Sequence, residues 1–201
     1  MKTRIFGPWF WVLLCVLLVL LLQGSLRSVA ATDQASSFKK TGSNLDKQAV
    51  IEATGMPPEV VDEIFHQTEL YDNLTPELIL ALIKKESNFH PGAIGPKGTI
   101  GLGQVMPSIG RWVAGQLGLS DYSTERLYNP IINVKITSFY LSKLISKYAG
   151  DHHKALTAYN MGSSNMRQYA SRRGTAESSY SRQVLEAREH IIQKYKISVS
   201  E

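Results

Sequence analysis

Apolar residues recur every three to four positions through most of the chain after residue 44, and no stretch alternates strictly between apolar and polar residues. This spacing places apolar side chains on one face of a helix. It predicts helices over residues 45–54, 59–71, 75–87, 108–117, 130–148, 152–160, 165–170 and 177–194. The fold class is therefore mainly α, with helices packed around a groove and at most a small β excursion in a glycine-rich loop.

The predicted helix at 75–87 carries a carboxylate on its apolar face. Thr75 and Pro76 are typical of a helix start, as a side-chain cap and a first helical residue without an N–H. Glu86 lies four residues after Leu82 and three after Ile83, so its carboxyl extends the apolar stripe. Burial there is expected to raise its pKa, which suits a proton donor. The alternative, an exposed glutamate in the last helical turn, is more common for an isolated glutamate.

The sequence after this helix is unusually rich in glycine. We expect residues 88–91 to end the helix, because a residue before proline is disfavoured in the helical conformation. The glycines that follow are Gly92, Gly95, Gly98, Gly101 and Gly103. They predict positive φ angles or close backbone approaches before the next helix begins near Pro107.

Three blocks together resemble the soluble lytic transglycosylase domain. The first runs from Glu86 to Pro107 and follows the family pattern E-S-x-F-x-P-x-A-x-S-x-x-G-A-x-G-L-M-Q-x-x-P. The second, residues 133–141, is similar to N-x-x-x-G-x-x-Y-L, with Ser138 in the glycine's place. The third, residues 158–162, is similar to A-Y-N-x-G. The resemblance covers about residues 56–195 and implies a lysozyme-like helical domain around a substrate groove.

The resemblance implies a role for each matched residue. Glu86 would act as the single acid and base that cleaves the bond between N-acetylmuramic acid and N-acetylglucosamine, leaving a 1,6-anhydro end. Neither a metal nor another cofactor is implied. The substrate-binding residues would be Ser87, Gln104, Met106, Tyr159, Asn160 and Tyr180.

Several of these residues also have plain structural interpretations. Ser87 could cap the helix instead of binding sugar, and Met106 could be a core methionine. Tyr180 fits core or rim packing nearly as well as the family's late tyrosine. Trp112 could stack on sugar, but the apolar face of a helix is the simpler interpretation. Asp121 and Glu125 are expected to be surface and capping residues.

Three residues depart from the family pattern near the proposed acid. Gly95 replaces a serine and removes a hydroxyl, Thr99 replaces an alanine, and Gly103 replaces a methionine and removes bulk from the groove wall. These departures bear on substrate contacts and turnover, and they leave the acid in place.

The N-terminal segment predicts export. Lys2 and Arg4 precede an apolar run from Trp9 to Leu22, and small residues follow at 28–31. This order is typical of a secretory signal, and a retained membrane anchor is the alternative. The predicted organisation is a signal peptide or anchor at 1–31, a polar linker with a short helix at 32–55, the transglycosylase domain at 56–196 and a tail at 197–201. Either alternative gives an exported, periplasmic or wall-facing protein that engages the membrane at least during export.

Charge and composition limit the classes of partner that the protein is expected to bind. The formal charge is +5, and three of the basic residues, Lys2, Arg4 and Arg27, belong to the N-terminal segment. The sequence shows no basic stripe with interleaved aromatic residues, which is the pattern that would indicate nucleic-acid binding. The histidines show no zinc-ligand spacing, and His152 and His153 are interpreted as surface residues. The partner that the resemblance implies is the peptidoglycan glycan strand.

Three functions remain open from the sequence. The first is a lytic transglycosylase, and the second is a lysozyme-like hydrolase on the same scaffold. The third is a wall-binding module without catalysis, within a secretion or conjugation machine. The small size of the protein is compatible with a role in such a machine. The sequence does not identify a partner protein in it.

Overall fold

The computed structural model describes residues 45–196. The signal peptide or anchor, most of the linker and the tail that the sequence predicts lie outside the described residues. Within them, the chain forms α-helices and one short 3₁₀ helix, η1, and no helix is long and apolar enough to cross a membrane. The elements are α2 (Lys47–Thr54), α3 (Pro58–Leu70), α4 (Pro76–Ser87), α5 (Pro107–Gln116), η1 (Thr124–Tyr128), α6 (Pro130–Lys147), α7 (His152–Met161), α8 (Ser163–Arg173) and α9 (Ser179–Tyr195).

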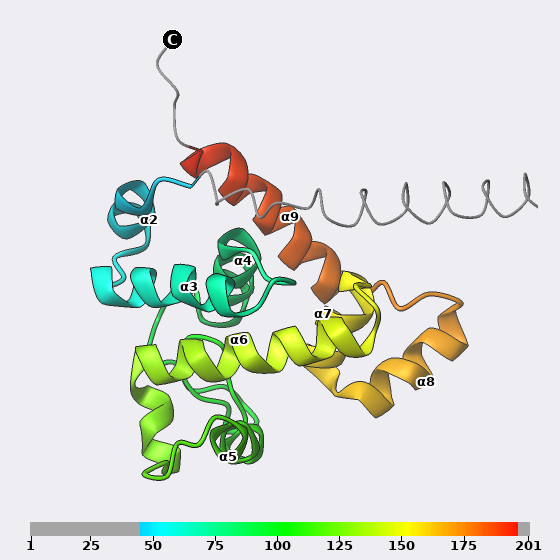
Figure 1. Cartoon of the computed structure of the whole chain (residues 1–201). Helices are drawn as coiled ribbons and strands as arrows, with labels where there is room; N and C mark the ends of the chain where they lie inside the picture. The colour runs from blue at the N-terminus through cyan, green and yellow to red at the C-terminus, as the bar shows by residue number, and fades with distance from the viewer. Residues whose placement is uncertain (1–44, 197–201) are drawn as a thin grey trace, which may run out of the picture. The chain divides into compact units, whose positions relative to one another are not determined.

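Helix α4 is the centre of the packing. It packs against α9 and contacts α3 (Figure 1). Every residue from Pro76 to Ile83 is buried, whereas Lys84 and Lys85 are exposed. The main buried cluster joins α4 to apolar residues of α2, α3, α6, α7 and α9. Burial of these side chains is the principal stabilising term of the fold.

The ends of α4 follow from local chemistry. The Thr75 hydroxyl accepts a hydrogen bond from the Leu78 amide, and Pro76 is the first helical residue. The helix ends at Asn88, which adopts the left-handed conformation with φ of 49°. Phe89 follows with φ of 66°, an uncommon conformation for a bulky side chain. The end of α4 is therefore set by two left-handed residues before the proline at position 91 is reached.

The glycine-rich loop contains the small β excursion that the sequence allows. Isolated antiparallel bridges join Ile94 to Ile100 and Ile100 to Val105. Asn133 of α6 fixes this loop from below: its amide nitrogen donates to the carbonyls of Ile100 and Leu127 at 2.9 Å each. Its carbonyl oxygen accepts from the Gly103 amide at 2.8 Å. One buried side chain thus satisfies three backbone groups of the loop and η1.

The fold confirms the predicted mainly α class, with two local corrections. The segment containing Asp121 and Glu125, predicted as a polar loop, includes the 3₁₀ helix η1. Helix α8 is longer than predicted, because it begins directly after Gly162 and continues to Arg173. Gly174, with φ of +71°, supplies the left-handed cap that ends it. The remaining helices agree with the predicted spans within two residues at either end.

Candidate active site

Glu86 lies in the last turn of α4, where the helix meets α9. Its side chain is half-buried, and the Tyr180 hydroxyl of α9 donates a hydrogen bond to its Oε1 atom. Tyr180 itself is 8% exposed. These residues are 94 positions apart in sequence. The packing of α4 against α9 is what brings them into contact.

The surroundings of Glu86 favour its protonated form. Burial raises the pKa of the Glu86 carboxyl above its ordinary value. The Tyr180 hydrogen bond and the positive charge of Lys85 lower this pKa, but burial is the largest effect and the pKa remains raised. A carboxyl held in this way can donate a proton nearer to neutral pH than an exposed glutamate.

Two tyrosine hydroxyls complete the polar surroundings of the acid. The Tyr159 hydroxyl of α7 donates to the Gly103 carbonyl at 2.7 Å. Burial and the charge of Glu86 raise the pKa of both Tyr159 and Tyr180. Both phenols therefore stay protonated and remain hydrogen-bond donors across the physiological pH range.

A groove of about 540 Å³ opens beside these groups. Its walls come from α4, the glycine-rich loop, the start of α5, one face of α6 and the end of α7. Among its lining residues Glu86 is the only carboxylate and Lys97 the only cation. The lining residues are Glu86, Pro96, Lys97, Thr99, Gln104, Val105, Met106, Ile109, Tyr140, Tyr159, Asn160, Met161 and Gly162.

The structure brings most of the sequence-predicted site residues to this groove. Glu86, Gln104, Met106, Tyr159 and Asn160 line it. Met106 is 44% exposed there, so it is not a core methionine.

Tyr180 is not among the lining residues and contacts the groove through Glu86. Ser87 lies outside the lining, and its hydroxyl donates to the Ile83 carbonyl at 3.2 Å within α4. This contact matches the local structural role that the sequence left open for it.

Gln104 holds the glycine-rich loop together. Its amide nitrogen donates to the carbonyls of Ala93 and Gly101 at 3.1 Å each, and its Oε1 accepts from the Thr99 hydroxyl at 2.7 Å. Gln104 has φ of 49°, as unusual as the left-handed residues that end α4. The strained backbone at Gln104 persists because these contacts over-determine the loop.

The family departure at Gly95 is matched by the departure at Thr99. A Cβ atom at position 95 would lie 2.2 Å from the Thr99 Oγ1 and 2.3 Å from the Gln104 Oε1. The serine of the family pattern therefore does not fit beside this threonine. The hydroxyl removed at position 95 is replaced by the Thr99 hydroxyl, which lines the groove.

The departure at Gly103 is matched in the same way on α6. The pattern N-x-x-x-G-x-x-Y-L has its glycine four residues after Asn133, so the residue in its place is Thr137, and the assignment to Ser138 was wrong by one position. A Cβ atom at position 103 would lie 2.0 Å from the Thr137 Oγ1. The chain thus places the small residue on the loop and the larger one on α6, and Thr137 fills the space beside Gly103.

Sequence reasoning missed several residues of the groove wall. Tyr140 of α6 is half-buried and lines the groove, although it is not among the predicted site residues. Its place in the N-x-x-x-G-x-x-Y-L block was the available signal. Lys97, Ile109 and Met161 also line the groove, and nothing in their local sequence distinguishes them from ordinary surface or core positions.

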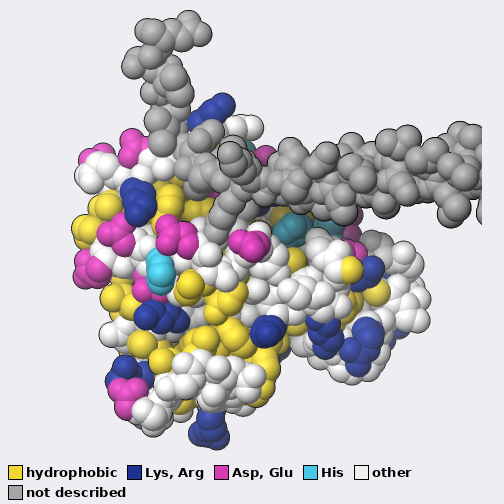
Figure 2. All heavy atoms as spheres, in the orientation of Figure 1, with side chains coloured by type: hydrophobic (Ala, Val, Ile, Leu, Met, Phe, Trp, Pro, Cys, Tyr) yellow, Lys and Arg dark blue, Asp and Glu magenta, His cyan; other side chains and the backbone are white. Residues whose placement is uncertain are grey.

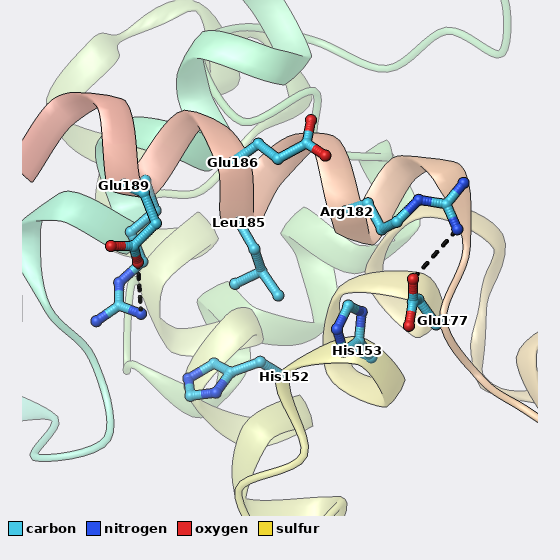
Figure 3. A pocket seen from close by; sticks show the side chains of 8 residues that line it. His152, His153, Glu177, Arg182, Leu185, Glu186 and Glu189 are labelled. Carbon is cyan, nitrogen blue, oxygen red and sulfur yellow. Dashed lines mark hydrogen bonds and ion pairs between the residues drawn. The ribbon is translucent and has the colours of Figure 1, made fainter.

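A second hollow, of about 520 Å³, lies between α7 and α9 (Figure 3). His152 and His153 line it and are not simple surface residues. Burial lowers the pKa of His152, and a ring nitrogen of His153 lies 2.9 Å from the Ser181 hydroxyl.

The carboxylates of this hollow do not converge on the histidines. Glu177 pairs with Arg182 at 3.2 Å, and Glu186 points away from the histidines in Figure 3. Within residues 45–196 no group of three or more histidine, cysteine or acidic side chains could hold a metal ion. We therefore assign no site to this hollow.

Fold and site together define a lysozyme-like helical domain with a single carboxyl acid in its groove. The chain belongs to the family described as Transglycosylase SLT domain, whose family model matches residues 63–181. The matched stretch includes Glu86 and Tyr180, the two ends of the hydrogen bond at the acid.

Curated relatives are lytic murein transglycosylases. The chain is 24% identical over 111 residues to the soluble lytic murein transglycosylase of Salmonella typhimurium, a match that covers 55% of this chain and 17% of that protein. It is 33% identical over 99 residues to the membrane-bound lytic murein transglycosylase C of Actinobacillus pleuropneumoniae, covering 44% and 27%. The match therefore spans less than a third of the length of either relative.

A solved structure shares the fold. An inactive glutamate-to-glutamine variant of lytic transglycosylase Slt from Pseudomonas aeruginosa aligns with a TM-score of 0.59 and 24% identity. The alignment covers 66% of this chain and 24% of that one. At this identity the likeness establishes the fold and says nothing further about the reaction.

We predict that Gly103→Ala destabilises the fold by about 1–3 kcal/mol, because its Cβ overlaps the Thr137 hydroxyl. Thr137→Gly should recover part of this loss in the double variant. The measurement is the free energy of unfolding from urea titrations of the four proteins in a double-mutant cycle.

Gly115→Ala is the matched control, because a Cβ atom at this helical position meets nothing within 4 Å. It should leave stability unchanged or raise it by up to about 1 kcal/mol. Strictly additive effects of the substitutions at positions 103 and 137 would contradict the proposed size match.

Proposed function

We propose that this protein is a peptidoglycan lytic transglycosylase in which Glu86 is the sole acid and base. The observation that carries the proposal is the half-buried Glu86 carboxyl, whose pKa is raised and which is the only carboxylate lining the groove. Breaking a glycosidic bond requires a proton donor at the bridging oxygen, and this carboxyl is suited to that task.

The absence of a second carboxylate from the groove lining favours transglycosylation over hydrolysis. Most glycosidases place two carboxylates across the scissile bond, one as acid and one as base or nucleophile. Neither Asp121 nor Glu125 is a candidate for the second carboxylate. Asp121 pairs with Arg126, and Glu125 is exposed on η1. The nucleophile is therefore expected to come from the substrate.

The proposed reaction returns every proton it uses. Glu86 donates its proton to the oxygen between N-acetylmuramic acid and N-acetylglucosamine, and the bond from that oxygen to the muramic C1 breaks. The neighbouring N-acetyl group or the site stabilises the cationic sugar. The muramic C6 hydroxyl then attacks C1 and gives its proton to the ionised Glu86. No water is added, and the product is a 1,6-anhydro ring.

Tyr180 is proposed to support the second half of this cycle. After the first proton transfer Glu86 is ionised, and a hydrogen bond from Tyr180 favours that form. Tyr159, bonded to the Gly103 carbonyl, is proposed to position the loop or the acetamido group of the substrate. Gln104, Met106 and Asn160 are proposed as groove contacts for the sugar.

The names of the relatives agree with this proposal. Two curated relatives are called lytic murein transglycosylases, and the Pseudomonas structure is that of an inactive variant in which a glutamate became glutamine. Peptidoglycan is the substrate that these names imply. The charged start, apolar run and small residues of positions 1–31 support export to the periplasm or cell wall, either by a cleaved signal or with a retained anchor.

Product analysis tests the proposed function. We predict that digestion of purified peptidoglycan yields muropeptides with 1,6-anhydromuramic ends, identified by mass spectrometry. Glu86→Gln keeps the shape of the side chain but cannot donate a proton, so product formation should fall by roughly 10²- to 10⁴-fold. Glu125→Gln, which removes an exposed carboxylate outside the groove, should leave product formation unchanged.

The alternatives give different products. Reducing muramic ends would identify a lysozyme-like hydrolase. No soluble product from the parent protein, with retained binding to peptidoglycan, would identify a wall-binding module. Equal activity of Glu86→Gln and the parent would refute the assigned acid.

We further predict a shifted pH profile for Tyr180→Phe. Because the Tyr180 hydrogen bond lowers the pKa of Glu86, its removal raises this pKa. Glu86 then stays protonated to higher pH, so the alkaline limb of kcat/KM moves to higher pH. The maximal rate should fall roughly ten- to a hundredfold, as expected for a lost hydrogen bond to a charged group.

The control for this profile is Tyr195→Phe, which removes a phenol from the same helix at a site away from Glu86. Its profile should match that of the parent. An alkaline limb that moves to lower pH in Tyr180→Phe would contradict the role given to this hydrogen bond.

A further inference from the structure

Aromatic rings form a continuous row from the Glu86 groove to the surface of α5. Neighbouring ring centroids are 5.4 Å apart for Tyr159 and Tyr140, and 6.2 Å apart for Tyr140 and Trp112. Trp112 also meets Phe139 at 6.0 Å. The first two rings, Tyr159 and Tyr140, line the groove, whereas Trp112 lies just beyond its lining. The row therefore leads outward from the acid.

Trp112 is unusually open for a side chain in such a cluster. It is 46% exposed, whereas its neighbour Phe139 is 8% exposed. Edge-to-face contacts with Phe139 and Tyr140 hold the indole on one side. These two contacts cover part of the side chain, and nearly half of it stays exposed to solvent.

The open indole continues a wall that already belongs to the groove. Met106 and Ile109 line the groove at the start of α5, and Trp112 follows Ile109 by three residues, on the same side of the helix. Tyr140 makes the same connection from α6, since it both lines the groove and contacts Trp112. Figure 2 shows hydrophobic side chains gathered over α6 and toward α5.

We propose that Trp112 is an additional sugar-binding platform, which holds a residue of the glycan strand beyond those at the Glu86 groove. The inference rests on the proposed function, because it takes a glycan as the occupant. The C–H bonds on a pyranose face carry partial positive charge, and the face of an indole is negative, so the two attract when stacked. The sugar hydroxyls at the rim stay in water, which an exposed platform allows.

The occupant is a linear glycan because the platform and the groove form one surface. A ligand that ended at the groove would leave Trp112 uncovered, whereas a strand that runs through the groove can reach it. Lys143, whose ammonium lies 5.2 Å from the Phe139 ring centroid, adds a cation beside this surface. The platform would therefore favour long strands over short fragments and would hold the strand on the enzyme between cuts.

Trp112 can report on its own occupancy. The chain has three tryptophans, and the other two are Trp9 and Trp11. In the full chain carrying Trp9→Phe and Trp11→Phe, indole fluorescence comes from Trp112 alone. The probe is a series of N-acetylglucosamine oligomers, from the dimer to the hexamer.

We predict a change in Trp112 emission with the longer oligomers and none with the dimer. Trp112→Leu keeps an apolar side chain but removes the ring, and it should weaken hexamer binding, measured by calorimetry, roughly three- to tenfold. Trp112→Phe should recover part of this loss. On long glycan strands Trp112→Leu should raise KM with little change in kcat, which a purely structural defect would not do.

Tyr128→Leu is the matched control, because this aromatic residue is 43% exposed and lies outside the groove lining. It should bind the hexamer as the parent does. Equal hexamer affinity of Trp112→Leu and the parent, or an equal emission change with dimer and hexamer, would overturn the platform. Anhydro products formed normally alongside that result would leave the proposed function standing, whereas their absence from the parent protein would remove both.

Discussion

The partial burial of the Glu86 carboxyl against Tyr180 is the interaction on which the site depends. A carboxyl removed from water binds its proton more tightly, and the phenol limits this effect by stabilising the ionised form. The two influences suit the role proposed for Glu86, which gives a proton and then takes one back. Their balance requires α4 and α9 to stay in contact, so the geometry of the proposed acid is tied to the main core.

The glycine-rich loop is the second requirement, because it carries one wall of the groove. Asn133, which belongs to α6, and Gln104, which belongs to the loop itself, form hydrogen bonds with its backbone polar groups. Buried polar groups that are fully paired fix one geometry, whereas partly paired ones destabilise the fold. These contacts hold the left-handed backbone of Gln104 in place at the groove that its side chain lines.

The local departures from the family pattern are consistent with this constraint. Gly95 with Thr99, and Gly103 with Thr137, each exchange bulk between two positions in contact. Gly95 with Thr99 keeps nearly the volume of serine with alanine, an exchange that close-packed interiors tolerate. Gly103 with Thr137 leaves less bulk than methionine with glycine would. The departures therefore describe a repacked groove floor and do not by themselves argue against catalysis.

Much of the fold could be predicted from the sequence, because helical spacing of apolar residues persists over long segments. The helix that carries Glu86 is the clearest case, with Thr75 and Pro76 at its start. The 3₁₀ helix η1 could not be predicted, since a single short turn has no periodicity. The extension of α8 was missed because its polar residues carry no apolar stripe.

The candidate site, like the fold, could be predicted from the sequence only in part. Glu86 could be chosen from its place on the apolar face of α4, and Gln104 and Tyr159 from the family blocks. The contact between Tyr180 and Glu86 could not be derived, because it depends on how two distant helices pack. The structural role of Thr137 was also hidden, since it becomes visible only when α6 and the loop are placed together.

The most direct test of this account is the pKa of the Glu86 carboxyl, measured by carbon-13 NMR during a pH titration of the folded protein. The resonance is assigned by its loss in Glu86→Gln. The account predicts a pKa above the ordinary glutamate value of 4.5, because burial outweighs the opposing contacts. A pKa at or below that value would mean that the carboxyl is ionised and solvated before substrate binds, and would contradict the central claim.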